Sequence, residues 1–384
     1  MTQTKGYRVP FVMELPYSIL KIWYIFRYHK YNLYVVGGAV RDAWLRKSPK
    51  DFDLATDALP DVVEQLLAEA GIPTVATGKA FGVINAFPDA DEYEIATFRE
   101  EAGYSDSRRP DEVRFSTIDK DVERRDLTMN ALFYDIDKKE IVDLVGGLHD
   151  IDHGIVRTVG SAIERFNDDK LRKMRAARFA ARFGSELEIS THEALLADSS
   201  LEGISAERIR DEFLAGIASA KSVVHYLKLL EKYELLRWVF RDLAFQTIFF
   251  EVRDPMVVIA FMLLRNDVLL TTGKLEKYLV ETLKYSGDEA AQVIFLLRFR
   301  YLTIDKAVFL KKNQKTAKVT GKQILLFNDT VGIYQEELVG PFINFSLTLN
   351  GDDIMRDYNL TPGKEVGDLL YKLETENFMK LIAK

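Results

Sequence analysis

The apolar positions along the chain change their spacing once, and this change divides the sequence into two regions. Up to residue 158, short apolar runs of strand length alternate with turns, as in residues 33–38 (LYVVGG), 52–56 (FDLAT), 81–87 (FGVINAF) and 92–99 (EYEIATFR). From residue 161 to 340, apolar residues recur at helical spacing, and glycine and proline are scarce. The pattern predicts an α+β fold, with a small mixed sheet and helices first and helices alone afterwards.

One apolar run raises the question of a membrane. Residues 17–26 (YSILKIWYIF) are interrupted by Lys21 and followed by Arg27. The run is too short to cross a bilayer and lacks the cleavage pattern of a signal peptide. It predicts an amphipathic helix with one buried face, and no contact with a membrane is expected.

Length, composition and cysteine content narrow the class of protein. The chain has 384 residues, of which 47% are hydrophobic and 29% charged, and it contains no cysteine. This length predicts two to four compact units, and the composition is that of a folded globular protein. The lack of cysteine excludes disulfides and thiolate metal sites, which agrees with a cytoplasmic protein.

Basic residues gather in two stretches, although the net charge is −7. Residues 164–182 contain seven basic and three acidic side chains, and residues 306–322 contain six lysines and no acid. Clusters of this kind can hold phosphate groups. A solvated helix face is the simpler interpretation of the second stretch alone. Its candidates for nucleic-acid contact are Lys311, Lys312, Lys315 and Lys318.

Two carboxylates separated by one apolar residue follow a pair of glycines. Side chains at i and i+2 of a strand point the same way, so Asp51 and Asp53 are predicted to stand together while Phe52 turns into the core. Carboxylates at that spacing can share Mg²⁺, whose coordination is commonly completed by substrate phosphates. A third carboxylate is needed to keep a second metal ion in place, and Glu94, on a strand expected beside the first, is the candidate.

The same stretch allows other interpretations. Two aspartates at this spacing also occur in surface turns, and a metal-dependent hydrolase would use the same ligands. A calcium-binding loop is excluded because the mid-loop glycine is missing and position 12 is Val62. The phosphate-binding motif G-x-x-x-x-G-K-[ST] does not occur. The backbone at Gly38 and the guanidinium of Arg41 are predicted to approach phosphate oxygens instead.

Several motifs, in a fixed order, make the sequence similar to a known family. GGAVRD, followed after eight residues by DFD, resembles the nucleotidyltransferase signature of the DNA polymerase beta superfamily. The whole set resembles the class II tRNA nucleotidyltransferases and bacterial poly(A) polymerases. The further motifs are RRDLTMNALFYD (124–135), DLVGGLHDID (143–152), RFNDDKLRKMRAARFAARFG (165–184), SAERIRDEF (205–213) and LTLNGDDIMRDYNLTPGKEVGDLL (347–370).

The resemblance implies a domain order and a reaction. It implies a catalytic head over residues 1–158, a helical neck with a base-reading helix over 159–217, a helical body over 218–320, and a tRNA-binding helical tail over 321–384. The implied reaction is the template-independent addition of CCA to the 3′ end of tRNA. Its substrates would be CTP and ATP, two Mg²⁺ ions would assist the nucleotidyl transfer, and pyrophosphate would be released.

The resemblance assigns the choice of base to the first basic stretch. Asp169 and Arg172 would read the incoming base, and Arg175 and Arg178 would hold the triphosphate or lock the reading pair. On one continuous helix these residues would form a slowly rotating stripe. A carboxylate that only accepts, beside a guanidinium that only donates, matches the edges of both cytosine and adenine. The family commonly has glutamate before the reading aspartate, where this chain has Asp168.

The second and third motifs imply supporting residues. Arg125 is the candidate for a phosphate or ribose contact, and Asp126 and Asn130 for the ribose, although a structural hydrogen bond explains Asn130 equally well. His149 and Asp150 resemble a metal phosphohydrolase pair. They fall in a segment where the family's aspartate supports the site, so that interpretation is not favoured.

Different activities of the family compete for this chain. Enzymes that add only CC are thought to lack a flexible loop, whereas residues 99–115, with Arg108 and Arg109, look complete. Full CCA addition is therefore expected, and poly(A) or A-only addition is the alternative. A catalytically inactive RNA-binding module is a remote alternative, because such a module gains nothing from keeping metal ligands together. No protein partner can be inferred.

Overall fold

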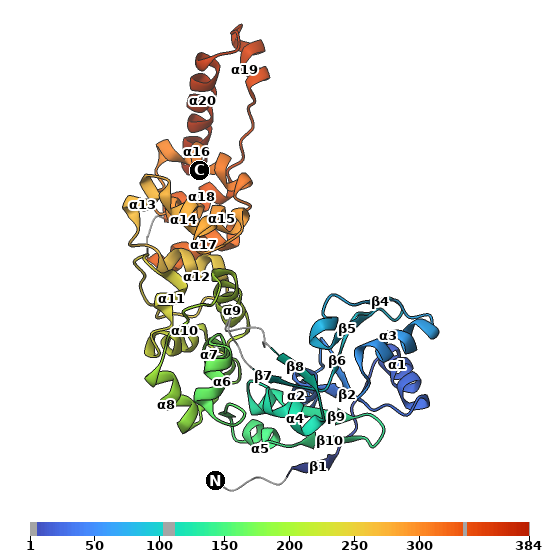
Figure 1. The fold of residues 1–384 in the computed structure, drawn as a ribbon. Coiled ribbons are helices and arrows are strands. Elements are labelled where there is room, and N and C mark those ends of the chain that lie inside the picture. The colour runs from blue at the N-terminus through green and yellow to red at the C-terminus, as the bar shows by residue number, and fades with distance from the viewer. Residues whose placement is uncertain (1–5, 103–111, 333–335, 384) are drawn as a thin grey trace. The chain divides into compact units, whose positions relative to one another are not determined.

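The computed structural model of the chain describes residues 6–102, 112–332 and 336–383. The chain forms two compact units, Met1–Ile204 and Ser205–Lys384 (Figure 1). Among the described residues, every strand lies in the first unit, and the second unit contains helices only. The predicted α+β class is confirmed. The boundary after Ile204 falls inside the neck predicted over residues 159–217. The division into head, neck, body and tail stays a prediction.

A mixed eight-stranded sheet forms the centre of the first unit. β3 and β6 run parallel, and the other neighbouring pairs are antiparallel. The connection between β3 and β6 includes α3 (Pro60–Glu69), which begins at its proline, a residue suited to the first turn of a helix. In spatial order the strands are β1 (Tyr7–Pro10), β10 (Glu140–Asp143), β9 (Leu132–Asp135), β2 (Leu33–Val36), β3 (Asp53–Thr56), β6 (Tyr93–Thr97), β5 (Val83–Ala86) and β4 (Thr74–Val75).

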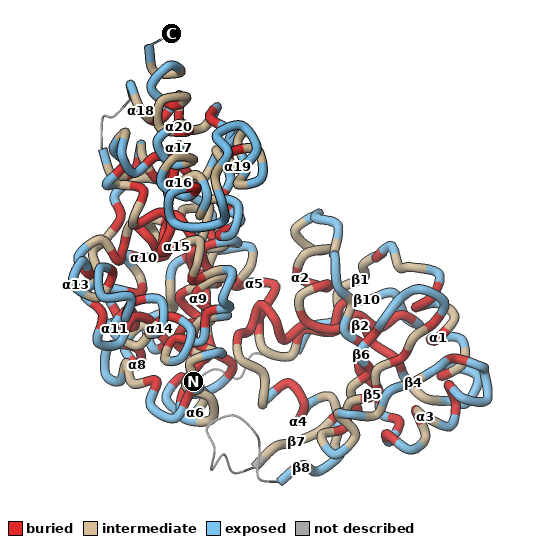
Figure 2. The backbone as a smooth tube through the Cα atoms, turned by 90° about the horizontal axis from the view of Figure 1, so that it is seen from above, coloured by how far each residue is buried: buried red, intermediate tan, exposed pale blue. Residues whose placement is uncertain are grey.

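Side chains alternate between two apolar layers on the faces of this sheet. On β3, Leu54 packs in the layer that contains Phe26 of α1 (Tyr17–Tyr28), and Ala55 packs in the opposite layer with Phe133. All four residues of β2 are buried (Figure 2). The predicted amphipathic helix therefore covers one face of the sheet. No helix of the described residues is long and apolar enough to cross a membrane.

The remaining elements of the first unit connect these strands or follow them. β7 and β8 pair as an antiparallel hairpin, and β11 and β12 as a short parallel pair. The elements are α2 (Gly38–Trp44), η1 (Lys79–Phe81), β7 (Arg99–Ala102), β8 (Glu112–Phe115), α4 (Ile118–Glu123), η2 (Thr128–Asn130), α5 (Gly147–Asp152), β11 (Ile155–Val156), α6 (Ala162–Asp168), α7 (Arg172–Phe183), β12 (Glu186–Leu187) and α8 (Ile189–Ala197).

One prediction about the helices is wrong. The sequence predicts one continuous helix from Asp169 to Arg178, but α6 ends at Asp168 and α7 begins at Arg172. Asp169 between them is extended, with φ −146° and ψ 104°, and its carboxylate accepts a hydrogen bond from the Leu171 N–H at 3.0 Å. An aspartate that bonds a nearby backbone N–H competes with continuation of the helix. The stripe of arginines therefore starts at Arg172, and Asp169 lies at the junction.

The second unit is built from helices around a buried central one. α12 has buried residues all around its axis, which is typical of a helix inside a core, and it contacts α9, α15 and α17. The helices are α9 (Ala206–Ser219), α10 (Val223–Lys232), α11 (Leu236–Phe240), α12 (Pro255–Met262), α13 (Asp267–Thr271), α14 (Lys274–Glu281), α15 (Gly287–Phe299), α16 (Ile304–Thr316), α17 (Gly321–Val331), α18 (Glu336–Asn344), α19 (Gly351–Tyr358) and α20 (Lys364–Ile382).

Two of these helices approach closely at a glycine. A β-carbon at Gly216 of α9 would lie 2.0 Å from the ring of Tyr226 on α10, and Tyr226 is fully buried. The tyrosine also donates a hydrogen bond from its hydroxyl to the Glu212 carbonyl at 3.4 Å. A side chain at position 216 would have to displace this ring.

Gly216→Ala is expected to destabilise the protein by about 1–3 kcal/mol, because the methyl group has no space beside Tyr226. Gly367→Ala is the matched control, since a β-carbon at Gly367 of α20 meets no atom within 4 Å. Alanine forms helix better than glycine by about 1 kcal/mol, so the control should be more stable than the wild type. Urea unfolding measures both changes, and a Gly216→Ala variant of wild-type stability would contradict this packing.

Candidate active site

The two aspartates of the D-x-D motif lie at the start of β3. Asp53 is the first residue of the strand and Asp51 precedes it, so the prediction that both lie on the strand is right only for Asp53. Phe52 packs against the apolar layer that contains α1, as predicted. β6 runs parallel to β3 in a register that puts Glu94 on the neighbouring strand beside Asp53.

The carboxylates of this group repel one another. Although Asp53 is accessible to solvent, the protein around its carboxylate raises its pKa by desolvation; Arg125 opposes the rise and Asp51 adds to it. Desolvation also raises the pKa of Glu94, and the charges of Asp53 and Glu92 add to this rise. Among the described residues, no cation forms an ion pair with Asp51, Asp53 or Glu94. A divalent cation would relieve the repulsion.

These carboxylates do not form a complete metal cage. In the described part of the chain, no group of three or more histidine, aspartate or glutamate side chains is placed to hold a metal ion. Mg²⁺ is commonly held by one or two carboxylates, with water and substrate phosphates as its other ligands. Asp51 and Asp53 fit a site of that kind, and Glu94 adds negative charge beside it.

The glycine pair forms the turn between β2 and α2. Gly37 has φ +70°, a conformation that residues with side chains rarely adopt. A β-carbon there would lie 3.6 Å from the Asn130 carbonyl and 3.8 Å from Nη1 of Arg125, and one at Gly38 would lie 3.4 Å from Nη2 of Arg41. The turn carries no side chain of its own, its Gly37 N–H donates to the Leu132 carbonyl at 2.9 Å, and Arg125 lies beside it.

Arg41 is buried, with 3% of its surface exposed. Its guanidinium donates to the Asp42 carboxylate at 2.9 Å and to the side-chain oxygen of Asn130. It also lies over the rings of Phe179 and Phe183, 5.3 and 5.1 Å from their centroids. Burial lowers the pKa of Arg41, and Asp42 acts against this. Arg41 thus connects α2 with η2 and α7, and its contact with a phosphate remains a prediction.

Asp126 connects the second motif with α7. Its carboxylate accepts hydrogen bonds from Nε of Arg175 at 2.8 Å, from Nη2 of the same residue at 2.6 Å, and from the Leu127 N–H at 2.7 Å. Burial acts to raise the pKa of Asp126, but Arg175 and the backbone bond lower it to about 2. The side-chain nitrogen of Asn130 lies 3.5 Å away. Asp126 and Asn130 therefore hold the site together, and their ribose contacts remain predictions.

Arg125 lies beside the glycine turn. Its Nε and Nη2 donate to Asp121 at 3.2 and 3.0 Å, and its guanidinium lies 4.6 Å from the ring centroid of Phe133. Burial lowers the pKa of Arg125, and Asp121 acts against this. Its charge acts on Asp53. This position suits the predicted phosphate contact.

Arg172, the first residue of α7, directs its guanidinium towards the end of α4. Nη2 donates to the Arg124 carbonyl at 2.9 Å, and Nη1 lies 3.5 Å from the Arg165 carbonyl. The Arg172 N–H donates to the carbonyl of Asp169 at 3.0 Å, so the two predicted reading residues are neighbours. Asp168 lies 3.1 Å from Nη2 of Arg165 and 3.7 Å from Nη1 of Arg172. Burial raises the pKa of Asp168, and both arginines oppose this.

The next two arginines of α7 lie against an aromatic ring. The guanidinium of Arg178 is 4.6 Å and that of Arg175 is 5.7 Å from the ring centroid of Phe179. Their contact with a triphosphate remains a prediction. Arg108 and Arg109, predicted for the flexible loop, lie outside the described residues.

The lysines predicted to contact tRNA lie on α16 and just after it. Lys312 and Lys315 are exposed, and Lys318 is paired with Asp288 at 2.5 Å. Lys311 is only partly exposed and donates to two carbonyls at the C-terminal end of α18, at 3.0 and 3.2 Å. Lys311 therefore stabilises the second unit, which a count of charges along the sequence does not reveal.

Asp121 and Arg124 contact residues of this site, although the sequence predicts no role for either. Asp121 is 1% exposed and binds both Arg124 and Arg125. On a helix, a residue faces those three and four positions later, and the arginines stand at these positions. This spacing was the signal in the sequence that could have identified them.

Comparison with known proteins identifies the family of this chain. The model of the Poly A polymerase head domain matches residues 33–157, and that of the probable RNA and SrmB-binding site of polymerase A matches residues 186–246. The chain is 32% identical over 366 residues to the CCA-adding enzyme of Ligilactobacillus salivarius. The aligned region covers 90% of this chain and 88% of that enzyme. The chain belongs to the CCA-adding enzyme family. The CCA-adding enzyme of Bacillus subtilis is 43% identical over 198 residues, about half of each chain.

Solved structures of CCA-adding enzymes have the same fold. The structure of the Bacillus stearothermophilus CCA-adding enzyme in complex with CTP has a TM-score of 0.69 and 25% identity, and the match covers 94% of this chain and 92% of that one. The Thermotoga maritima CCA-adding enzyme, complexed with tRNA, has a TM-score of 0.66 and 19% identity, covering 99% and 98%. At 19% identity, the likeness to the Thermotoga maritima enzyme supports only the assignment of the fold.

The pairing of Asp126 with Arg175 predicts a pH dependence of stability. The pKa of Asp126 is depressed from 3.8 to about 2 in the folded protein. The pair should therefore contribute on the order of 2 kcal/mol above about pH 4, and this should be lost as the pH falls towards 2. Asp126→Asn should lower the free energy of urea unfolding at neutral pH, and the difference from the wild type should shrink below about pH 4.

Asp119→Asn, which removes an exposed carboxylate from the first turn of α4, is the control for this titration. It should change stability little at any pH. A constant difference between Asp126→Asn and the wild type across the acid range would contradict the assigned ion pair.

Proposed function

We propose that this member of the CCA-adding enzyme family adds cytidine, cytidine and adenosine in turn to the 3′ end of tRNA. It uses CTP and ATP, needs no nucleic-acid template and releases pyrophosphate. The observation that carries the proposal is the meeting of Asp53 and Glu94, on neighbouring strands, with Arg125 at a glycine turn. The lack of cysteine supports a cytoplasmic location for this activity.

The carboxylates would bind the metal ion on which the family generally depends. Asp51 and Asp53 are the ligands we assign to Mg²⁺, because they are accessible and unpaired among the described residues. Glu94 raises the negative charge of the site and so favours a cation. When bound, magnesium lowers the pKa of the attacking 3′-hydroxyl and neutralises charge on the leaving pyrophosphate.

The triphosphate would lie between the glycine turn and Arg125. The Gly37 N–H already donates to the Leu132 carbonyl at 2.9 Å, so the N–H of Gly38 is the group we assign to a phosphate oxygen, and Nη1 of Arg125 lies beside Gly37. Arg125 is already oriented by Asp121, so little side-chain freedom is lost when the phosphate binds. This orientation favours one position of the reacting phosphate relative to the carboxylates.

The base would be chosen by Asp169 and Arg172. Cytosine and adenine each present an amino group beside a ring-nitrogen acceptor, which a carboxylate and a guanidinium can satisfy together. Uracil and guanine present the reverse order and would leave buried groups without partners, at a cost of about 1–3 kcal/mol per pair. The ion pair of Asp126 with Arg175 would hold α7, which begins at Arg172, in the position that this selection needs.

The direct test is incubation of tRNA that lacks its CCA end with Mg²⁺ and each labelled nucleotide. We expect two CMP additions followed by one AMP addition and little use of UTP or GTP. Long A tails would indicate a poly(A) polymerase, AMP addition only to tRNA that already ends in CC would indicate an A-adding enzyme, and no incorporation would indicate an RNA-binding module.

Asp53→Asn is expected to lower the rate of CMP addition by at least about a thousandfold, because the site loses the negative charge of one metal ligand and keeps its shape. Binding of tRNA, measured by fluorescence anisotropy, should stay within about twofold of the wild type. Asp119→Asn is the matched control and should keep wild-type activity. Equal losses of binding and rate in Asp53→Asn would contradict a role in metal binding.

A further inference from the structure

We propose that Asp121 is a positioning residue for this reaction, which sets both the arginine beside the metal-binding carboxylates and the arginine at the base-reading position. It acts through two neighbouring arginines, Arg125 and Arg124. The inference rests on the proposed function, and it assigns to one buried carboxylate a joint influence on rate and on choice of nucleotide.

Both oxygens of Asp121 are occupied by arginines. Oδ1 accepts from Nε and Nη2 of Arg124 at 2.9 and 2.8 Å, and Oδ2 accepts from Nε and Nη2 of Arg125 at 3.2 and 3.0 Å. The backbone N–H of Arg99 is 3.3 Å from Oδ1. Burial acts to raise the pKa of Asp121, but the two arginines hold it below its usual value. The carboxylate is therefore charged at neutral pH and fixes two guanidinium groups at once.

The first branch leads to the catalytic carboxylates. Arg125 donates two of its N–H groups to Asp121, and its remaining terminal nitrogen, Nη1, lies 3.8 Å from the β-carbon position of Gly37. The ring of Phe133 lies against one face of the guanidinium, with its centroid 4.6 Å from the guanidinium carbon. Held on an edge and on a face, Arg125 has one orientation for a phosphate at the glycine turn.

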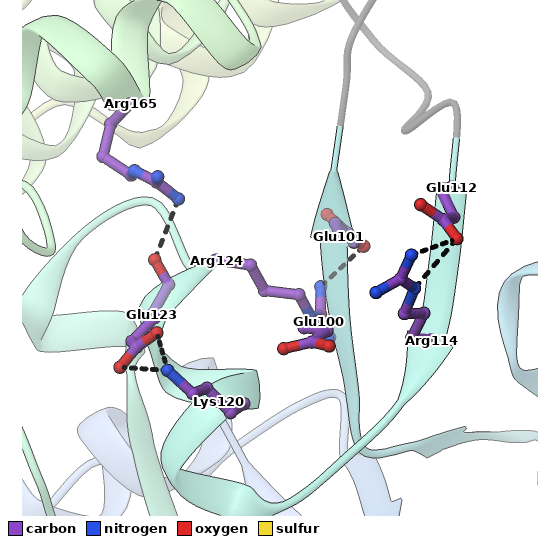
Figure 3. A pocket seen from close by; sticks show the side chains of 8 residues that line it. All are labelled: Glu100, Glu101, Glu112, Arg114, Lys120, Glu123, Arg124 and Arg165. Carbon is purple, nitrogen blue, oxygen red and sulfur yellow. Dashed lines mark hydrogen bonds and ion pairs between the residues drawn. The ribbon is translucent and has the colours of Figure 1, made fainter.

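The second branch leads to α7. The backbone carbonyl of Arg124 accepts the 2.9 Å hydrogen bond from Nη2 of Arg172, and its side chain is anchored by Asp121. Nη1 of Arg124 also lies 3.3 Å from Oε1 of Glu101 on β7. Figure 3 shows the side chain of Arg124 extending towards Glu101 at a pocket of about 290 Å³, whose lining side chains among the described residues are all charged. Asp121 thus fixes the residue whose carbonyl orients Arg172.

The charges of this cluster explain why a neutral residue at position 121 would disturb both branches. Three guanidinium groups, those of Arg99, Arg124 and Arg125, share two carboxylates, Asp121 and Glu101. Removal of one carboxylate charge would leave neighbouring cations that repel each other. The side chains of Arg124 and Arg125 would then lose their charge-assisted bonds to residue 121, and each side chain could adopt other rotamers.

Asp121→Asn keeps the size of the side chain and removes its charge. We expect the rate of CMP addition to fall about tenfold or more, and the ratio of UMP to CMP incorporation in competition to rise about tenfold. Affinity for tRNA should stay within about twofold. Asp119→Asn, on the exposed face of the same helix, is the matched control and should change neither quantity.

Arg124→Lys separates the two branches and guards against a misfolded Asp121 variant. It keeps a positive charge and the carbonyl that Arg172 uses, but loses the planar fork that binds Asp121 and Glu101. We expect the incorporation ratio to shift towards UMP while the rate of CMP addition stays within about threefold of the wild type, because Asp121 still holds Arg125.

The proposal is overturned if Asp121→Asn lowers thermal stability but keeps the wild-type rate per folded molecule and the wild-type incorporation ratio. It is also overturned if Asp121→Asn does not fold and Arg124→Lys leaves the ratio unchanged. The wild-type protein is assayed in parallel: if it adds no CMP, the proposed function fails, which this comparison distinguishes from failure of the role of Asp121.

Discussion

The ion pair between Asp126 and Arg175 is the interaction on which the arrangement of the site depends. It joins the segment that follows α4 to α7, and Arg41 makes a second connection by lying over Phe179 and Phe183. A guanidinium can pair along its edge and stack on its face, so one side chain can fix both distance and orientation. The residues beside the sheet and those of α7 therefore belong to one packed unit.

Charge is distributed unequally within that unit. The carboxylates at the starts of β3 and β6 have no ion-pair partners among the described residues, and desolvation raises the pKa of Asp53 and Glu94. The nearby arginines are bound instead by Asp121 and Asp126. Like charges side by side reduce stability, and such strain is common where a cation or substrate must bind. Because Arg125 is paired with Asp121, it lies close to Asp53 without forming an ion pair with it.

Features set by local rules could be predicted from the sequence. The alternation of Phe52 with its neighbours, the buried face of α1 and the start of α3 at Pro60 follow from side-chain periodicity and backbone restrictions. The spacing that joins Asp121 to its arginines follows the same rules. The position of Asp53 beside Glu94 depends on the pairing of β3 with β6. The spacing of apolar residues predicts the two strands, but only their order along the chain suggests that they are neighbours.

Other features depend on distant neighbours or on a competing local bond. The helix breaks near Asp169 because its carboxylate bonds a backbone N–H, and periodicity does not count such bonds. Arg41 and Lys311 are charged residues that tertiary partners largely enclose, aromatic rings of α7 in one case and the end of α18 in the other. Their partners lie far along the chain, so the sequence predicted a phosphate contact for Arg41 and a nucleic-acid contact for Lys311 without their enclosure by these neighbours.

Crystals of the protein grown with Mn²⁺ and a non-hydrolysable CTP analogue would test the central claim most directly, through the anomalous scattering of the metal. We expect a metal peak bound by Asp51 and Asp53 and by phosphate oxygens, with the cytosine edge in hydrogen bonds to Asp169 and Arg172. A metal bound elsewhere, or a cytosine that touches neither residue, would contradict the account.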